Sequence, residues 1–318
     1  MNKLEKAAQT VITRALDLRK GESVLIIADE PYLDLAHLLF AAAEKKSNHI
    51  HLLQVGRDYL QRNALCGPVE RLMLEMNVIL ALTSTSISHS SSRREACRQG
   101  ARCITMTAIT NDTFARIAEM DFSRIARLSR KLADILTIAK EIEISAPNGT
   151  QLRIAAARAK GYADTGEVTQ PGAFSNLPAG EASLAPEFAG TSGEVVIDSG
   201  MGVQPNDHER TVLHIRDGRV VRIAGGVAAN RLRRQLAPYG PESRLIAEFG
   251  IGTNESARLS GYPLEDEKVH GTIHVAVGNN LSFGGSNDVP IHLEAIVYQA
   301  SVAIDGRKIL EHGKLVLM

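Results

Sequence analysis

The sequence lacks an excess of charge of either sign. Its 318 residues include 36 basic and 36 acidic side chains, so the formal net charge is zero. No net field would therefore attract nucleic acid or an anionic membrane surface. We expect neither a nucleic-acid partner nor a membrane, and instead a small molecule or a short peptide as substrate.

Cysteine is scarce, and long apolar runs are missing. Cys66, Cys97 and Cys103 form no pair with the spacing of a zinc site, and their odd number favours a reducing compartment. The N-terminal residues lack the apolar core of a signal peptide, and no apolar run is long enough to span a membrane. We expect a cytoplasmic protein in which Cys97, on a helical-looking segment without a neighbouring base, is structural.

A glycine-rich phosphate loop is also missing. The first expected strand runs into residues 28–31 without such a turn. The segment from Gly250 to Glu255 lacks a third glycine and a following helix. Both absences argue against dinucleotide binding.

The N-terminal part of the chain has the pattern of an α/β domain. Apolar runs alternate with amphipathic stretches, which is typical of β-α units that build a mostly parallel, Rossmann-like sheet. A long helix with one apolar stripe is expected over about residues 121–139, and we place the first domain at residues 1–139. The expected strands are 24–28, 49–55, 78–82 and 103–106, and the amphipathic stretches include 33–43 and 68–76.

After this helix the apolar pattern changes to a period of two. Residues 141–145 and 152–154 predict one hairpin, and residues 212–222, with a turn at Asp217 and Gly218, predict another. We therefore expect residues 140–318 to form a β-rich α+β domain that binds metal. Glycine, proline and serine are frequent over residues 161–186, which we expect to form irregular walls of a pocket.

This second part carries five side chains that could ligate a metal. Carboxylates together with imidazoles suit zinc, manganese, cobalt or iron(II), whereas magnesium and calcium prefer oxygen ligands alone. The mixed set therefore predicts a divalent transition metal. The candidate ligands are Glu181, Glu248, His274, His292 and Glu294.

The spacing of these residues supports one shared site. His292 and Glu294 are two residues apart, so in a strand they point to the same face while Leu293 packs behind them. His274 opens an alternating run that could pair with this strand through a turn at residues 279–285. Glu248 precedes two glycines, where a bend can re-aim a side chain, and Glu181 follows an expected turn at Pro178 and Gly180.

Two further sets of polar residues lie close to the candidate ligands in sequence, and neither indicates a specific role. The charged run Glu265-Asp266-Glu267-Lys268 is expected to be a solvated loop or a capping segment. His270 is expected either beside the ligands or at the surface.

The order and sequence of these segments resemble those of the thermophilic metallo-aminopeptidases, the family of aminopeptidases T and S. The resemblance covers nearly the whole chain and implies that the five candidate ligands hold a pair of divalent metals and that the chain forms a homodimer. Glu294 stands where the family has aspartate, and residues 278–281 lack the tyrosine that the peptidases place after the first histidine. Further matching segments are 88–90, 93–96, 100–102, 146–150 and 305–307.

The resemblance implies a metal-dependent hydrolase, an aminopeptidase or an amidase that acts on a small amino-acid-like substrate. Two ions of zinc, cobalt or manganese would share a water, and Glu181 or Glu248 would double as the proton shuttle. The same wider family contains 2,5-dihydroxypyridine dioxygenases, so a ring-cleaving iron(II) enzyme that uses His274, His292 and Glu294 is the alternative. A metal-free binding protein on the same fold is a third hypothesis.

Overall fold

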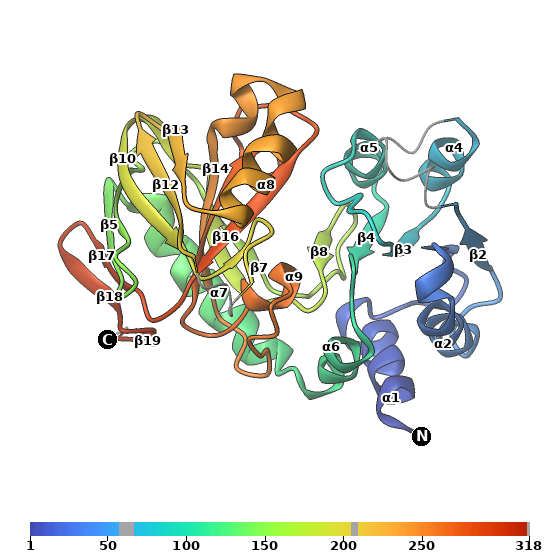
Figure 1. Ribbon diagram of the computed structural model, residues 1–318. Helices are drawn as coiled ribbons and strands as arrows, with labels where there is room; N and C mark the ends of the chain where they lie inside the picture. The colour runs from blue at the N-terminus through green and yellow to red at the C-terminus, as the bar shows by residue number, and fades with distance from the viewer. Residues whose placement is uncertain (57–66, 205–208, 317–318) are drawn as a thin grey trace. The chain divides into compact units, whose positions relative to one another are not determined.

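The structure is a computed structural model that describes residues 1–56, 67–204 and 209–316 (Figure 1). The chain folds into two compact units. The first unit comprises Met1–Ala126 and Asp164–Ala179, and the second comprises Arg127–Ala163 and Gly180–Met318. The domain boundary expected after residue 139 stays a prediction, and Cys66 lies outside the described residues.

A parallel sheet of five strands forms the centre of the first unit, in the order β2-β1-β3-β4-β8. Four of its strands are the expected apolar runs, and every residue of β1, β3 and β4 is buried, as in a parallel sheet that is covered on both faces. The fifth strand, β8, lies in the segment that we expected to be irregular. The bounds are β1 Val24–Ala28, β2 Ile50–Gln54, β3 Val78–Leu82, β4 Arg102–Thr105 and β8 Phe174–Asn176.

Helices cover the two faces of this sheet. Val24 and Ile26 of β1 belong to one apolar cluster with residues of α1, α2 and α6, whereas Leu25 and Ile27 belong to another with residues of α4 and α5. Because neighbouring residues of a strand point to opposite faces, the two clusters lie on opposite sides of the sheet. The helices are α1 Lys3–Thr10, α2 Leu33–Glu44, α4 Pro68–Leu74, α5 Ser91–Arg98 and α6 Asn111–Arg116.

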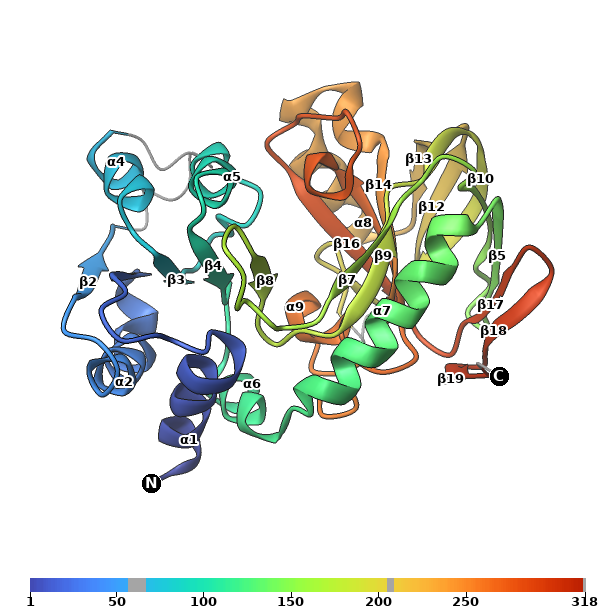
Figure 2. The same cartoon turned by 180° about the vertical axis from the view of Figure 1, so that it is seen from behind.

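Two antiparallel sheets and two longer helices build the second unit, so the chain as a whole is a mixed α/β protein (Figure 1). The expected long helix is α7, Phe122–Ile138, and α8 spans Val227–Leu236. Apolar residues of both sheets and both helices form one core. Figure 2 shows α7 packed along this unit, where Ser129 Oγ lies 2.8 Å from Thr253 Oγ1.

The larger sheet has eight strands in the order β13-β12-β10-β6-β5-β17-β18-β19. Both expected hairpins, β5-β6 and β12-β13, are confirmed. Asp217 and Gly218 join β12 to β13 with φ angles of 45° and 69°, the positive values that a tight hairpin turn requires. The bounds are β5 Glu141–Ser145, β6 Gln151–Ala155, β10 Glu187–Ile197, β12 Thr211–Arg216, β13 Arg219–Ala224, β17 Ser301–Ile304, β18 Arg307–Glu311 and β19 Lys314–Leu315.

The smaller sheet has six strands in the order β11-β16-β15-β14-β9-β7. The expected pairing of the two histidine strands is confirmed, because β15 runs antiparallel to β16. The bounds are β7 Gly161–Asp164, β9 Glu181–Leu184, β11 Ser199–Gly200, β14 Ile246–Gly252, β15 Ile273–Gly278 and β16 His292–Val297. Among the described residues no helix is both long and apolar enough to cross a membrane.

Candidate metal centre

Four adjacent strands of the six-stranded sheet carry the five candidate ligands. Glu181 opens β9, Glu248 lies in β14, His274 lies in β15, and His292 and Glu294 lie in β16. The register places Gly252 opposite Glu181 and Ala276 opposite Glu294. The five residues, separated by up to 113 positions in sequence, therefore meet on one face of this sheet.

A glycine makes room for one of the imidazoles. Gly250 lies opposite His274 in the register of β14 and β15. A Cβ atom at this position would lie 2.2 Å from His274 Nε2, which is far inside van der Waals contact. The absence of a side chain at Gly250 therefore lets the imidazole lie across the neighbouring strand. We expected this glycine to bend the strand, and its close approach to His274 was not foreseen.

The ligand atoms form two groups that share one carboxylate. His274 Nε2 lies 3.4 Å from Glu181 Oε2 and 3.6 Å from Glu248 Oε1. His292 Nε2 lies 3.3 Å from Glu248 Oε2 and 3.4 Å from Glu294 Oε1. In each group, one ligand atom from every residue lies within 4.8 Å of the others. The two histidines belong to different groups, and Glu248 belongs to both.

These separations fit metal ligands better than hydrogen bonds. Two ligand atoms that each lie about 2.1 Å from a tetrahedral zinc are roughly 3.4 Å apart. Glu248 Oε1 and His274 Nε2 are buried and have no hydrogen-bond partner. Because burying such groups without a partner is costly, a cation between the two atoms would explain their arrangement. The donor set and its spacing thus fit a divalent transition metal.

The side chains perturb one another's protonation strongly. Burial would raise the pKa of Glu248, but the two adjacent histidines outweigh burial and lower this pKa to about 2. Burial would lower the pKa of His292, but the carboxylates of Glu248 and Glu294 outweigh it and raise this pKa to about 10. The same balance raises the pKa of His274. At neutral pH an ion must therefore displace a proton from His292 when it binds.

The second ring nitrogen of His292 is fixed by the backbone. His292 Nδ1 lies 2.8 Å from the carbonyl oxygen of Asn279, to which it can donate its proton. This contact turns Nε2 toward the carboxylates, as is usual for histidine ligands. The ring of Phe283 stacks on the imidazole, with 5.7 Å between centroids and 30° between planes. Sequence analysis did not single out Phe283, because nothing in its spacing links it to His292.

The charged run at residues 265–268 is not a solvated loop, and this expectation was wrong. Its four residues are at most 2% exposed. Lys268 Nζ lies 2.7 Å from Glu181 Oε1 and 2.7 Å from Glu267 Oε1. Asp266 accepts hydrogen bonds from Ser260 N at 2.7 Å and from Ser199 Oγ at 2.8 Å. The run can be buried because its charges have partners, some of them remote in sequence, such as Glu181 and Ser199.

Glu267 is a buried carboxyl group beside the candidate ligands. Burial, together with the neighbouring carboxylate of Glu294, raises the pKa of Glu267 well above its usual value. Lys268 places its ammonium against both Glu181 and Glu267, and the raised pKa favours the neutral form of Glu267 more than that of a free glutamate. The sequence did not reveal these roles of Lys268 and Glu267, because a run of mixed charges normally indicates a solvent-exposed segment.

Glu181 is the first residue of β9 and follows Pro178 and Gly180, where a turn was expected. The turn precedes it, at Gly180, where a Cβ atom would lie 2.8 Å from Asn254 Cβ. His270 is partly buried and belongs to neither ligand group. Cys97 and Cys103 are buried free cysteines of the first unit and take no part in the centre.

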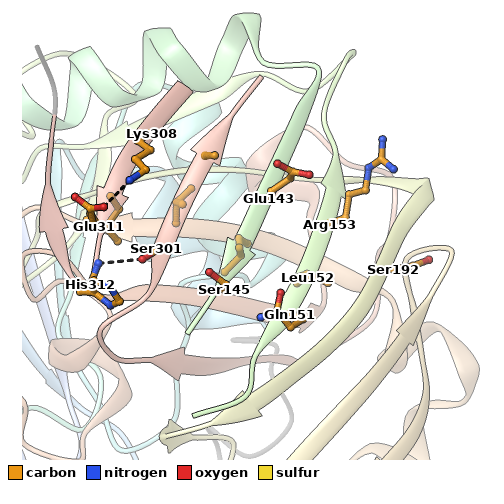
Figure 3. Close-up of a pocket in the computed structure, with 14 residues that line it drawn as sticks. Glu143, Ser145, Gln151, Leu152, Arg153, Ser192, Ser301, Lys308, Glu311 and His312 are labelled. Atoms are coloured by element: carbon orange, nitrogen blue, oxygen red, sulfur yellow. Dashed lines mark hydrogen bonds and ion pairs between the residues drawn. The ribbon is translucent and has the colours of Figure 1, made fainter. Parts of the chain in front are cut away.

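A separate hollow lies on the eight-stranded sheet (Figure 3). It has a volume of about 720 Å³ and is lined by residues of β5, β6, β17 and β18. Its charged side chains pair locally, as in the 2.6 Å contact between Lys308 Nζ and Glu311 Oε1. None of the five candidate ligands lines it.

Comparisons with known proteins place the chain in a family. The family model for 2,5-dihydroxypyridine 5,6-dioxygenase (NicX) matches residues 5–317. No curated protein sequence matches the chain significantly. Two similar solved structures come from different classes of enzyme, an oxygenase and an aminopeptidase.

Both structures share the fold over almost their whole length. The 2,5-dihydroxypyridine dioxygenase of Pseudomonas putida KT2440 is 17% identical with a TM-score of 0.82, covering 100% of this chain and 99% of its own. AmpT of Thermus thermophilus, an aminopeptidase T, is 16% identical with a TM-score of 0.71, covering 99% of each chain. At these identities the similarity establishes the fold alone. The match to the family model extends over nearly every residue, and the chain therefore belongs to the 2,5-dihydroxypyridine 5,6-dioxygenase family.

Proposed function

We propose that the chain is a metal-dependent hydrolase, an aminopeptidase or amidase that acts on a small amino-acid-like substrate. One observation carries this proposal: the two histidines fall in separate ligand groups that share Glu248. A carboxylate between two ions that lie about 3.5–4 Å apart is typical of two-metal hydrolases. A single ion with two histidines and one carboxylate would instead require both imidazoles in one group.

The two groups assign ligands to two ions of zinc, cobalt or manganese. Glu181, Glu248 and His274 would hold one, and Glu248, His292 and Glu294 would hold the other. Bound there, the ions would supply a water of lowered pKa and polarise the scissile carbonyl. Glu294 is the most exposed of the five, with 20% of its side chain accessible, so substrate would approach from its side.

Residues of the chain would prepare this site in distinct ways. Lys268 donates to Glu181 Oε1 and thereby turns Oε2 toward His274. The carbonyl of Asn279 selects the tautomer of His292. We propose Glu181 and Glu248 as the acid–base residues, because they are the two more buried of the three carboxylates that face the imidazoles.

Ring cleavage by a single iron(II) ion is the second candidate. The family model favours it, because it matches nearly the whole chain and is described by that reaction. This chemistry would draw on His274, His292 and Glu294. The third hypothesis, a metal-free binding protein, is disfavoured by the buried atoms of Glu248 and His274 that have no hydrogen-bond partner.

Metal analysis with paired assays distinguishes the two chemistries. Protein purified without chelator should contain two zinc, cobalt or manganese ions per chain and should cleave amino-acyl amides equally well under air and under argon. One iron per chain, with oxygen consumption on a dihydroxypyridine, would replace the hydrolase by the dioxygenase. Absence of bound transition metal would remove both.

A further inference from the structure

A second hollow in the second unit lies beside the candidate metal centre. It has a volume of about 500 Å³ and is lined by residues of three segments, 158–162, 185–189 and 280–286. Three of its side chains are aromatic, although aromatic residues make up 4% of the sequence. These are Tyr162, Phe188 and Phe283. We call this hollow the aromatic pocket.

The aromatic pocket contacts the candidate centre through one ring. Phe283 stacks on His292 and meets Tyr162 edge to face, with 6.4 Å between the ring centroids and 81° between the planes. Phe283 thus lines the pocket and packs against a candidate ligand. A molecule bound on this wall would lie next to the centre.

The charge at the pocket is positive. Arg158 and Glu187 form an ion pair at 3.6 Å, and Glu187 also accepts a hydrogen bond from the backbone of Arg158. Lys160 lies with Nζ 5.5 Å from the centroid of Tyr162. Over residues 1–56, 67–204 and 209–316, no carboxylate contacts Lys160. One cation beside the aromatic wall is therefore available to a ligand.

The wall is also firmly held. Gly284 has φ of 77°, and a Cβ atom there would lie 2.7 Å from Tyr162 Oη, so the loop approaches the tyrosine closely only with glycine at this position. Asn287 Nδ2 donates to the carbonyls of Gly278 and Glu242, and Asn287 N donates to Asn280 Oδ1. These bonds fix both ends of the loop that presents Phe283. Such a preorganised wall loses little conformational entropy when it binds a ligand.

We infer that the aromatic pocket binds an aromatic carboxylate, with the ring on Phe283 and Tyr162 and the carboxylate at Lys160. One part of the inference rests on the proposed hydrolase. If the chain is that hydrolase, the ligand is the C-terminal aromatic residue of a short peptide, and the amide before this residue lies at the candidate centre. Aromatic rings gain from edge-to-face packing as well as from burial, and the ammonium favours the charged end.

Three probes without a hydrolysable bond test each part of the ligand. Binding of 3-phenylpropionate to the protein as purified is measured by titration calorimetry. The alcohol 3-phenylpropanol lacks the charge, and 3-cyclohexylpropionate lacks the flat ring, so both should bind several-fold more weakly. A fourth probe, N-acetyl-L-phenylalanine, carries an amide and is therefore measured on chelator-treated protein. It should bind more tightly than 3-phenylpropionate if the occupant is a peptide end; equal binding assigns the pocket to a free aromatic acid.

Two variants with matched controls locate the binding. Lys160→Gln should weaken 3-phenylpropionate about three- to fivefold, as expected for an exposed ion pair, and should leave 3-phenylpropanol unchanged. Tyr162→Leu should weaken both probes. Lys314→Gln and Tyr239→Leu, exposed positions of the same unit outside the pocket, should change neither. No binding at millimolar probe, or equal losses in variants and controls, overturns the inference.

The pocket and the proposed hydrolase can fail separately. Treatment with chelator should abolish turnover but leave binding of 3-phenylpropionate within about twofold, because Lys160 and Tyr162 lie outside the ligand groups. Binding that disappears with the metal means that the carboxylate contacts the ion and overturns the pocket. Binding that persists in a protein without amide cleavage overturns the hydrolase and retains the pocket.

Discussion

Replacing Lys268 by methionine tests whether the buried lysine balances Glu181. The substitution keeps the length of the side chain and removes the ammonium that lies 2.7 Å from both Glu181 and Glu267. The lysine side chain is 1% exposed, and the two glutamates are 9% and 3% exposed, so solvent cannot replace the lost partner.

The structure sets the magnitude of the loss. Removing one partner of a buried pair costs about 3–5 kcal/mol, because a charge is left buried without compensation. We take the lower end, because burial and the carboxylate of Glu294 raise the pKa of Glu267 and so favour its neutral form, which leaves Glu181 as the main charge without a partner. We expect the chelator-treated variant to lose about 3 kcal/mol of unfolding free energy. With metal loaded, the ion compensates Glu181, and the loss should fall to less than half of this.

Urea unfolding of both forms, with and without metal, measures this difference. Lys308→Met is the matched control, because its pair with Glu311 is 70% and 46% exposed and should contribute at most about 1 kcal/mol. The reasoning is refuted if Lys268→Met is no less stable than Lys308→Met, or if metal loading leaves its loss unchanged.

Four further outcomes are expected. His292→Ala should abolish metal-dependent activity and cancel the rise in melting temperature that metal produces. Leu293→Ala should lower the free energy of unfolding by about 2 kcal/mol, because Leu293 is only partly buried, and should keep the metal content of the folded protein. Full metal content and activity in His292→Ala would contradict the site. Gly250→Ala should displace His274, and mass spectrometry should count one ion fewer per chain. Gly56→Ala is the control, because a Cβ atom at Gly56 would meet nothing within 4 Å. An unchanged ion count would refute this role of Gly250. Zinc added to chelator-treated protein in weak buffer at pH 7 should release protons, because the pKa of His292 is about 10 and the ring loses its second proton when it binds the ion. An indicator dye that records no release would show that the imidazoles were already neutral. Light scattering at micromolar concentration should give about twice the 34.3 kDa of one chain, since sheet edges are usually covered, and a species of one chain alone would exclude the homodimer.

The strands of the candidate centre could be predicted from sequence because each is defined locally. His292 and Glu294 alternate with Leu293, and a period of two together with a turn is enough to predict a pair of strands with both histidines on one face. The same logic found the hairpin at Asp217 and Gly218. These features depend on neighbours within a few residues.

The partners of the buried charged side chains could not be predicted from local sequence in this way. Lys268 pairs with Glu181, 87 positions away, and nothing within the run at 265–268 reveals that partner. Pro178 and Gly180 predict a turn before Glu181, but nothing near Glu181 in sequence reveals that it pairs with Gly252 of β14. The division of the ligands into two groups likewise depends on tertiary distances, which spacing along one strand does not determine.

The order in which the chain visits its two units limits how the protein can be cut. The chain passes from the first unit to the second after Ala126, returns for Asp164–Ala179 and then leaves again. The returning segment supplies β8, which pairs with the edge of β4. A truncated product that ends at residue 139 would lack this strand and expose the backbone of β4, so it should aggregate when expressed by itself. Separate production of the first unit would require residues 164–179 to be joined to it through an engineered linker.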